Sequence, residues 1–296
     1  MAAAWVVCSC AEKALEDQPS VLNHVSIGVK AVDMTDISAE TKSDIDISGG
    51  FVNFSWSSTD VVGMYPNVGA QAFFEMQDHV GEAVAEFDGG GWALKSASQY
   101  AVYFPYDYGH SNKSSLPFDY RGQTQHGRNS FSHLADWQFL AQGMKQPENG
   151  ACAYSMERIE AIVLFQLQFP DIVNCDKLTF RLADGHKVVI STRLDISGTD
   201  YVISSDGEAN QFTLDLEGVA PLSTGETLYF YAMMPPQDLS GRTAIVSVHT
   251  TDGDNYYAAF DGKNMLANHA YQYAATLTND YASFMEKYGL EDGFWD

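Results

Sequence analysis

The side chains with the most reactive chemistry in this chain are its four cysteines, and their positions predict two different roles. Two of them stand near the start, whereas Cys152 and Cys175 lie far along the chain. Cys10 follows the small residue Ser9, closes the apolar stretch that begins with residues 2–7, and is itself followed by polar residues. A thiol in this position is suited to lipid attachment, so Cys10 is the predicted lipidation site.

The Ser9-Cys10 pair resembles the lipobox of bacterial lipoproteins, in which a signal peptide is cut before a cysteine that then carries acyl chains. Cys10 fits better than Cys8, because Ser9 is small where Val7 is not. The resemblance predicts a signal remnant and linker over residues 1–20 and a lipid-anchored location at the outer membrane and cell surface. Later segments lack the roughly 18 consecutive apolar residues of a membrane span, so lipid is the expected membrane contact. An ordinary N-terminus with two incidental cysteines is the alternative.

Cys152 and Cys175 allow two states: a disulfide in an oxidising compartment, or two buried free thiols. Neither belongs to a CxxC pair or has a nearby histidine, so we expect no zinc site. Asp252-Gly253-Asp254 resembles the start of a calcium loop, but its glycine comes too early and no glutamate follows at the required distance. We therefore interpret it as a hairpin turn.

Motifs of enzymes and cofactor sites are missing from the sequence. The eight histidines stand singly, and there is no HExxH, G-x-S-x-G, P-loop or G-x-G-x-x-G segment followed by a helix. We therefore predict a protein that is not an enzyme and needs no cofactor. A pair of facing carboxylates, as in glycoside hydrolases, is assembled in space and leaves no spacing signal, so a secreted hydrolase stays open as a distant alternative.

Composition limits the partners. The chain has 296 residues, of which 45% are hydrophobic, and its net charge is −23 from 39 acidic and 16 basic residues. Such a field repels a phosphate backbone, so nucleic acid is excluded as a partner. The length suits one large domain or two medium ones.

The dominant hydrophobic period is two, which predicts β-strands. Residues 159–169 alternate, with Glu160 on the more polar face and apolar residues on both faces of the first half. Asp184-Gly185 marks a hairpin between two such segments. The other expected strands cover residues 25–29, 51–56, 61–65, 83–87, 92–95, 100–106, 178–182, 188–196, 212–216, 244–249, 256–260 and 271–277. Many short strands at close spacing favour an all-β sandwich or barrel.

A turn-rich segment, residues 143–150, divides the two halves. We place the domain boundary there, which gives an N-terminal domain over residues 21–147 and a C-terminal domain over 148–296. Each is large enough to bury its own core.

One short helix is predicted near the end of the chain. Tyr281, Phe284, Met285 and Tyr288 share one helical face, with Asp280 as the N-cap and Gly289 as the C-cap. Two helical turns are marginal alone, so we expect Phe284 and Met285 to pack inward against the second domain.

Four stretches in order resemble the fimbrillin-like family of type V pilus subunits from Gram-negative anaerobes. They are residues 54–66 (FSWSSTDVVGMYP), Trp92 followed by 100–106, residues 133–141, and residues 265–271, where Asn268 replaces the usual glycine. The resemblance implies two tandem transthyretin-like β-sandwich domains, surface display on a pilus and adhesion. It also implies that a protease removes the first strand, and that a strand from another pilus subunit then fills the groove.

The chain departs from this family at the processing site. No arginine precedes Arg121, so only Lys30 and Lys42 are available for a cut after the first strand. Lys30 ends an apolar strand that would hide it, whereas Lys42 lies in a polar loop and is the predicted processing site. If Lys42 is an ordinary loop lysine, the protein is a non-polymerising anchor or accessory tip subunit.

Frequent tyrosines, most of all in residues 100–108, also suit stacking on carbohydrate. The alternative function is therefore a lipid-anchored glycan-binding protein of the same bacterial surface. Host or bacterial receptors and glycans are the expected partners on either interpretation.

Overall fold

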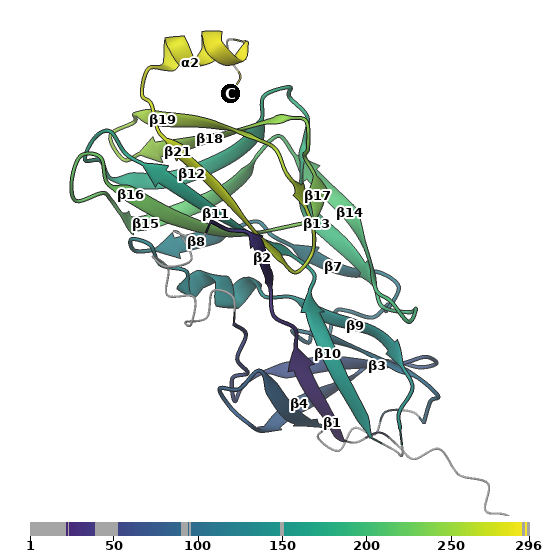
Figure 1. Ribbon diagram of the computed structural model, residues 1–296. Coiled ribbons are helices and arrows are strands. Elements are labelled where there is room, and N and C mark those ends of the chain that lie inside the picture. Colours follow the sequence, from purple (N-terminus) through teal and green to yellow (C-terminus); the bar gives the residue numbers. More distant parts are fainter. Residues whose placement is uncertain are drawn as a thin grey trace, which may run out of the picture.

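The computed structural model describes residues 22, 24–38, 53–89, 94, 96–148, 151–291 and 294. These residues form an elongated, mostly β molecule with a smaller unit at one end, a larger unit at the other, and a short C-terminal helix beyond it (Figure 1). Within the described ranges, no helix has the length and apolarity needed to cross a membrane. The expected all-β class with a short C-terminal helix is thereby confirmed.

The smaller unit is a closed ring of strands in the order β1-β10-β9-β6-β3-β4-β5. Their bounds are β1 (His24–Val29), β3 (Val61–Pro66), β4 (Ala72–Asp78), β5 (Val84–Asp88), β6 (Tyr100–Phe104), β9 (Leu140–Lys145) and β10 (Cys152–Arg158). β1 closes the ring because it pairs with β10 on one side and β5 on the other. Where a sandwich was expected, the first unit is thus a barrel.

Aromatic side chains fill the barrel. Residues 53–56, part of a predicted strand, are not a strand; instead the backbone N–H of Trp56 donates to the Glu82 carbonyl at 2.9 Å. The Trp56 ring is 1% exposed and packs edge-on against Phe87 with ring centres 4.8 Å apart. Gly63 makes room for a further ring, because a Cβ there would lie 2.0 Å from Tyr103.

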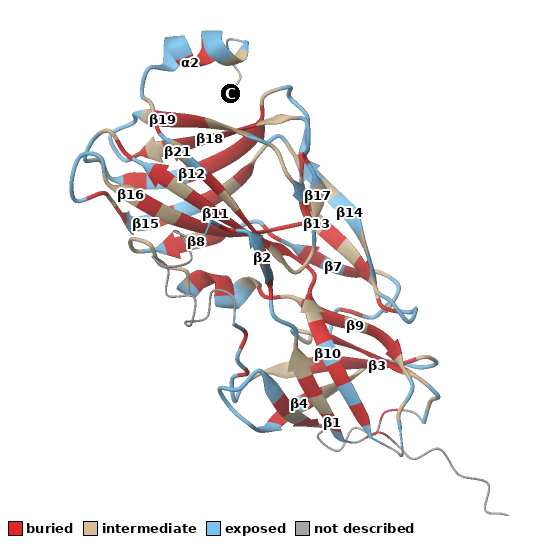
Figure 2. Ribbon diagram, viewed as in Figure 1, coloured by how far each residue is buried: buried red, intermediate tan, exposed pale blue. Residues whose placement is uncertain are grey.

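The larger unit is built around a core between two sheets. One sheet has the order β16-β11-β21-β2 and the other β19-β18-β12-β15-β8. Their strands are β2 (Asp33–Asp36), β8 (Gln123–His126), β11 (Ala161–Gln168), β12 (Cys175–Leu182), β15 (Phe212–Val219), β16 (Thr227–Met234), β18 (Thr243–Thr250), β19 (Asn255–Asp261) and β21 (His269–Thr276). Buried and exposed residues alternate along several of these strands (Figure 2), as the sequence period predicts.

A third sheet, a two-stranded ladder and a 3-10 helix accompany the two units. β7 (Leu116–Asp119), β13 (Val188–Asp195) and β14 (Val202–Ala209) form a three-stranded sheet, and β17 (Gln237–Asp238) pairs with β20 (Asn264–Met265). The 3-10 helix η1 (Ser132–Trp137) lies between β8 and β9 in the chain.

Strand pairing crosses the expected boundary at residues 147/148. β10 follows that boundary in the chain, yet it pairs with β1 and β9 in the barrel. β7 and β8 precede it, yet they pair with β13 and β15 of the larger unit. The turn-rich segment begins inside β9, and Glu148 bridges to Ala151 just before β10, so the segment belongs to the barrel sheet and does not separate two domains.

β11 explains why the two units share a second core. Val163 and Phe165 point into the core of the larger unit, whereas Ile162 and Leu164 point into a cluster with Tyr103 and other residues from the first half. The prediction that the first half of this strand is buried on both faces is confirmed. Glu160 directly precedes β11 and was expected on the more polar face, but it is fully buried.

The C-terminal helix α2 (Tyr281–Tyr288) forms as predicted. The Asp280 side chain accepts a hydrogen bond from the Ser283 backbone N–H at 3.1 Å, and Gly289 ends the helix with a φ of 63°. Phe284 is 5% exposed and stacks on Tyr257 of β19 with ring centres 5.3 Å apart. The helix therefore docks on the outer face of the five-stranded sheet.

Replacing Phe284 with alanine is expected to lower the free energy of unfolding by about 2 kcal/mol, near the lower end for large-to-small changes because the helix covers a surface. The melting temperature of the full chain should fall by roughly 3–6 °C in calorimetry. Glu286→Ala, on the exposed face of the same helix, is the control. Equal melting of both variants would show that the docked helix contributes nothing to stability.

Candidate functional site

The first described strands of the chain form one continuous segment that runs along both units. This segment, residues 24–37, is called here the N-terminal strap. Its β1 lies in the barrel between β5 and β10, and its β2 pairs in parallel with β21 at the edge of the four-stranded sheet (Figure 1). A single segment thus closes the barrel with β1 and adds the edge strand β2 to a sheet of the larger unit.

Alternating side chains fix β1 in the barrel. Val25 is 1% exposed and Ile27 is 0% exposed, and both join the aromatic core. The register places Ile27 opposite Ala85 of β5 and Tyr154 of β10. Burial of a valine and an isoleucine stabilises by roughly 1.5–3 kcal/mol each, so β1 is held mainly by these two side chains.

Charged groups hold both ends of β1. The two ring nitrogens of His24 lie 2.7 Å from a Glu86 carboxylate oxygen and 2.5 Å from one of Asp88. The hydrogen bond to Asp88 is the largest influence that raises the pKa of His24, so the imidazolium form is favoured. At the other end the Lys30 backbone N–H donates to the Met156 carbonyl at 2.9 Å, and its ammonium group pairs with Glu157.

β2 is held at the sheet edge by the turn before β21. The Asp33 backbone N–H donates to the Asn268 carbonyl at 2.9 Å, and the Asn268 amide donates to the Ala31 carbonyl at 3.0 Å. Asn268 has a φ of 58°, a left-handed conformation that asparagine tolerates better than most residues. Asparagine at this position therefore fits the backbone geometry, and its side chain adds a bond to the strap.

The two cysteines outside the N-terminal region are free thiols in different cores. Cys152 lies opposite Val25 in the β1–β10 register and belongs to the barrel core, whereas Cys175 belongs to the core of the larger unit. Both are buried, and burial raises the pKa of each thiol. Of the two alternatives for this pair, free thiols are the state found; the disulfide is not formed because the cores are separate.

Two predicted site residues, Cys10 and Lys42, lie outside the described residues. Lys30 is paired through its backbone, as expected for a strand end. Asp252-Gly253-Asp254 is the predicted turn, with a φ of 91° at Gly253. Among the residues that the structure describes, no group of three or more histidine, cysteine or acidic side chains could hold a metal ion.

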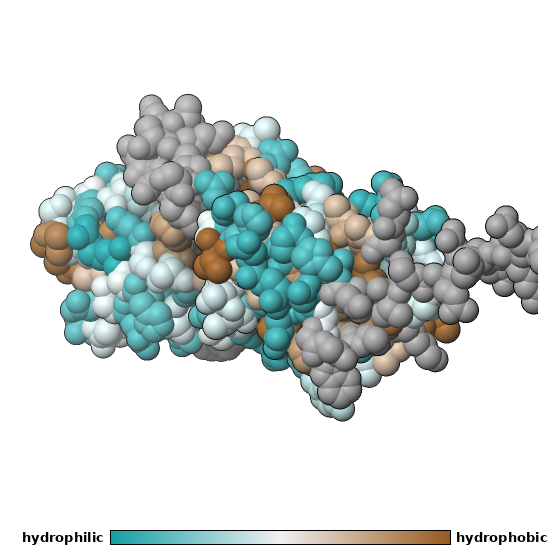
Figure 3. Space-filling model, turned by 90° about the horizontal axis from the view of Figure 1, so that it is seen from below, coloured by the Kyte–Doolittle hydropathy of each residue, from teal (hydrophilic) through white to brown (hydrophobic). Residues whose placement is uncertain are grey.

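The tyrosines of residues 100–108 mostly pack inward. Tyr100 and Tyr103 are fully buried, and only Tyr108, at 87%, is widely exposed. On the face seen in Figure 3, apolar side chains form separate patches and no continuous platform. Glu86 and Asp88 have no sequence signal as partners of the strap, because their contact with His24 depends on the β1–β5 register.

No protein-family model and no curated protein matches the chain. Solved structures do match. A "putative cell adhesion protein" from Bacteroides ovatus has a TM-score of 0.56 at 10% identity, over 88% of this chain and 95% of that one. A protein of the same description from Bacteroides uniformis has a TM-score of 0.50 at 11% identity, over 76% and 88% of the two chains. At these identities the likeness is one of fold, and at that level it confirms the resemblance noted in the sequence.

Proposed function

We propose that this chain is a fimbrillin-like surface protein with a structural and adhesive role in a type V pilus. The observation that carries the proposal is the N-terminal strap, because one short terminal segment closes the barrel between β5 and β10 and also covers the edge at β21. The fold shared with cell adhesion proteins supports the same role.

Assembly would proceed by strand exchange after a cut at Lys42. Loss of the strap would leave unpaired backbone groups on β5 and β10 above the side chains that Val25 and Ile27 now cover. An open edge over an apolar groove accepts an extended strand from another molecule. The incoming strand would need apolar side chains at the two positions of Val25 and Ile27, with a small or polar residue between them.

Location follows from the same proposal. Acylation of Cys10 would tether the precursor to the outer membrane, and assembly would display it at the cell surface. The transthyretin-like description of the fold also belongs to the proposal; the two facing sheets of the larger unit support it, and the closed barrel departs from it.

Limited digestion with a lysine-specific protease tests the proposal. The parent chain, cut after Lys42, is expected to form oligomers in size-exclusion chromatography with light scattering, whereas Lys42→Ala should stay monomeric. Lys30→Ala is the matched control and should behave like the parent, because the Lys30 backbone is paired in β1 and the adjoining turn. A parent chain that remains monomeric after mass spectrometry confirms loss of the strap would refute strand exchange. The same spectra, taken on protein from its native membrane, report whether Cys10 is acylated.

A further inference from the structure

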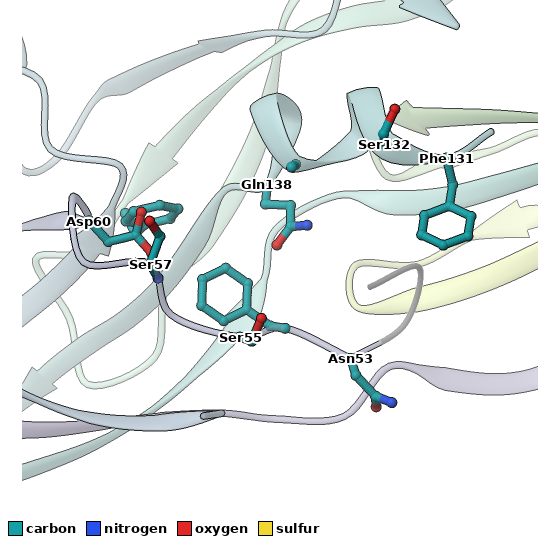
Figure 4. A pocket seen from close by; sticks show the side chains of 10 residues that line it. Asn53, Ser55, Ser57, Asp60, Phe131, Ser132 and Gln138 are labelled. Carbon is teal, nitrogen blue, oxygen red and sulfur yellow. The ribbon is translucent and has the colours of Figure 1, made fainter. Parts of the chain in front are cut away.

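A cavity lies where the barrel meets η1. Its volume is about 280 Å³, and it opens between the segment before β3 and the 3-10 helix (Figure 4). The lining residues are Asn53, Phe54, Ser55, Ser57, Asp60, Phe104, Phe131, Ser132, Ala135 and Gln138. The cavity thus combines phenyl rings with hydroxyl, amide and carboxyl groups, and none of the described residues that line it is basic.

Gln138 is the polar group that a ligand would satisfy. It is 9% exposed, yet its side-chain amide makes no hydrogen bond to any residue that the structure describes. Its amide extends from the end of η1 toward the side of the cavity where Ser55 lies (Figure 4). The amide atoms of Gln138 are not sealed from solvent, so water bonds them in the free protein and a ligand would replace that water.

Two further polar groups lie on the opposite wall. One Asp60 carboxylate oxygen accepts the Ser57 backbone N–H at 2.7 Å, which fixes the carboxylate at the cavity. Burial raises the pKa of Asp60. Where Asp60 is ionised, its negative charge repels an anionic ligand, and where it is protonated it can donate a hydrogen bond to a neutral one. The Ser55 hydroxyl is exposed and has no hydrogen-bond partner among the described residues.

The apolar wall is rigid. The Phe54 ring packs edge-on against Phe104 with centres 5.8 Å apart and against Trp56 at 4.6 Å. The Arg158 guanidinium, itself fully buried, lies 6.0 Å from the Phe54 ring centre. These contacts hold the Phe54 ring in place at the cavity wall, and they leave the phenyl groups available for apolar contact with a ligand.

We propose that this cavity binds one neutral sugar residue of a glycan. A pyranose ring presents an apolar C–H face to phenyl rings and hydroxyl groups to amides, hydroxyls and carboxylates, which is the mixture found here. The volume admits a small ring with its substituents. Among the described lining residues there is a carboxyl group and no basic group, which disfavours sulfated sugars and uronic acids, and the polar groups disfavour a purely apolar ligand. The inference extends the adhesive part of the proposed function, but it does not require trimming or strand exchange.

The test uses the untrimmed chain and titrates D-galactose, D-mannose, L-fucose and N-acetyl-D-glucosamine by ligand-observed and amide NMR. At least one neutral sugar is expected to bind with a millimolar or tighter Kd, and glucuronic acid at least tenfold more weakly. Gln138→Met, which keeps the volume and removes both hydrogen-bonding groups, should weaken binding by about tenfold. Gln77→Met, exposed on β4 away from the cavity, should bind like the parent.

Three results would overturn the inference: no binding of any neutral sugar, equal binding by Gln138→Met, or binding of glucuronic acid alone. If Gln138→Met melts below the parent, Ser55→Ala replaces it, because Ser55 is exposed and has no structural bond to lose. Its binding should weaken severalfold, and unchanged affinity counts against the site. Oligomerisation of the trimmed chain is a separate readout, so either proposal can fail while the other stands.

Discussion

Removal of the N-terminal strap is expected to make the Cys152 thiol react with an alkylating reagent at least about tenfold faster, while Cys175 stays protected. Cys152 is 4% exposed and lies opposite Val25 across the β1–β10 register. Cys175 is 3% exposed in the core of the larger unit, which the strap's β1 does not enter. The two thiols therefore form an internal pair of probe and control in one molecule.

The energetics favour a large effect. Withdrawal of Val25 and Ile27 from the barrel core costs roughly 3–6 kcal/mol of burial, against a total stability of about 5–15 kcal/mol for a typical domain. Burial raises the pKa of Cys152 in the intact protein. Removal of β1 exposes the thiol, so its pKa falls toward the ordinary value and the reactive thiolate fraction increases. Exposure and ionisation thus act in the same direction.

The measurement is mass spectrometry of alkylated peptides over time, with a chain that starts at Ala11 so that only two thiols remain. Verified trimming after Lys42 is compared with the uncut chain. A synthetic peptide of residues 22–38 should restore protection of Cys152, and the same peptide with Ile27→Asp should not. Protection that persists in trimmed protein free of the strap would mean that β5 and β10 close on each other without it.

Local structure was well predicted from the sequence, because it depends on nearby residues. The period of two located about half of the strands that the structure describes, and it missed β4, β9, β10, β14 and β16 among others. A turn does form at Asp184-Gly185, with a φ of 73° at the glycine. The hairpin predicted there is wrong, because β12 pairs with β15 and β18, whereas β13 pairs with β7 and β14 of another sheet. The caps Asp280 and Gly289 bound α2 as predicted. Each of these features is set by the conformational preferences of a few consecutive residues.

Pairing between distant strands was not predictable in the same way. The turn-rich segment before β10 has the composition of a linker, but only the parallel β1–β10 register shows that it lies within the barrel. The candidate sugar cavity had no sequence signal, because Gln138 follows a 3-10 helix and meets Ser55 only through the fold. Such contacts join residues far apart in the chain, and no local preference encodes them.

Between the two units, replacing Glu160 with glutamine is expected to stabilise the protein, and by more as the pH rises. Glu160 and Arg158 are both fully buried near the junction of β10 and β11. The Glu160 carboxylate accepts long bonds, 3.3 and 3.4 Å, from the Phe139 backbone N–H. The three guanidinium nitrogens of Arg158 have no hydrogen-bond partner among the described residues. Burial raises the pKa of Glu160 to about 8, despite the attraction of Arg158.

The direction of the pH dependence follows from proton binding. Between the ordinary carboxyl pKa and about 8, the folded protein keeps the Glu160 proton and the unfolded chain releases it. Stability is therefore lost as pH rises through this interval, by up to about 1.4 kcal/mol per pH unit. Glutamine mimics the protonated side chain and removes the loss. The variant should match the parent near pH 5 and exceed it by about 2–3 kcal/mol near pH 7.

Urea unfolding of the full chain at several pH values between 5 and 8 measures the difference, with Glu157→Gln, in the neighbouring strand β10, as the control. Burial acts to raise the pKa of Glu157, but hydrogen bonds from Lys30 and Tyr201 outweigh it and hold that pKa below its ordinary value. Loss of this carboxylate should therefore destabilise the protein at neutral pH, the opposite sign. If Glu160→Gln is instead less stable than the parent at every pH, Glu160 is ionised in the folded protein, and its attraction to Arg158 exceeds the cost of burying both charges.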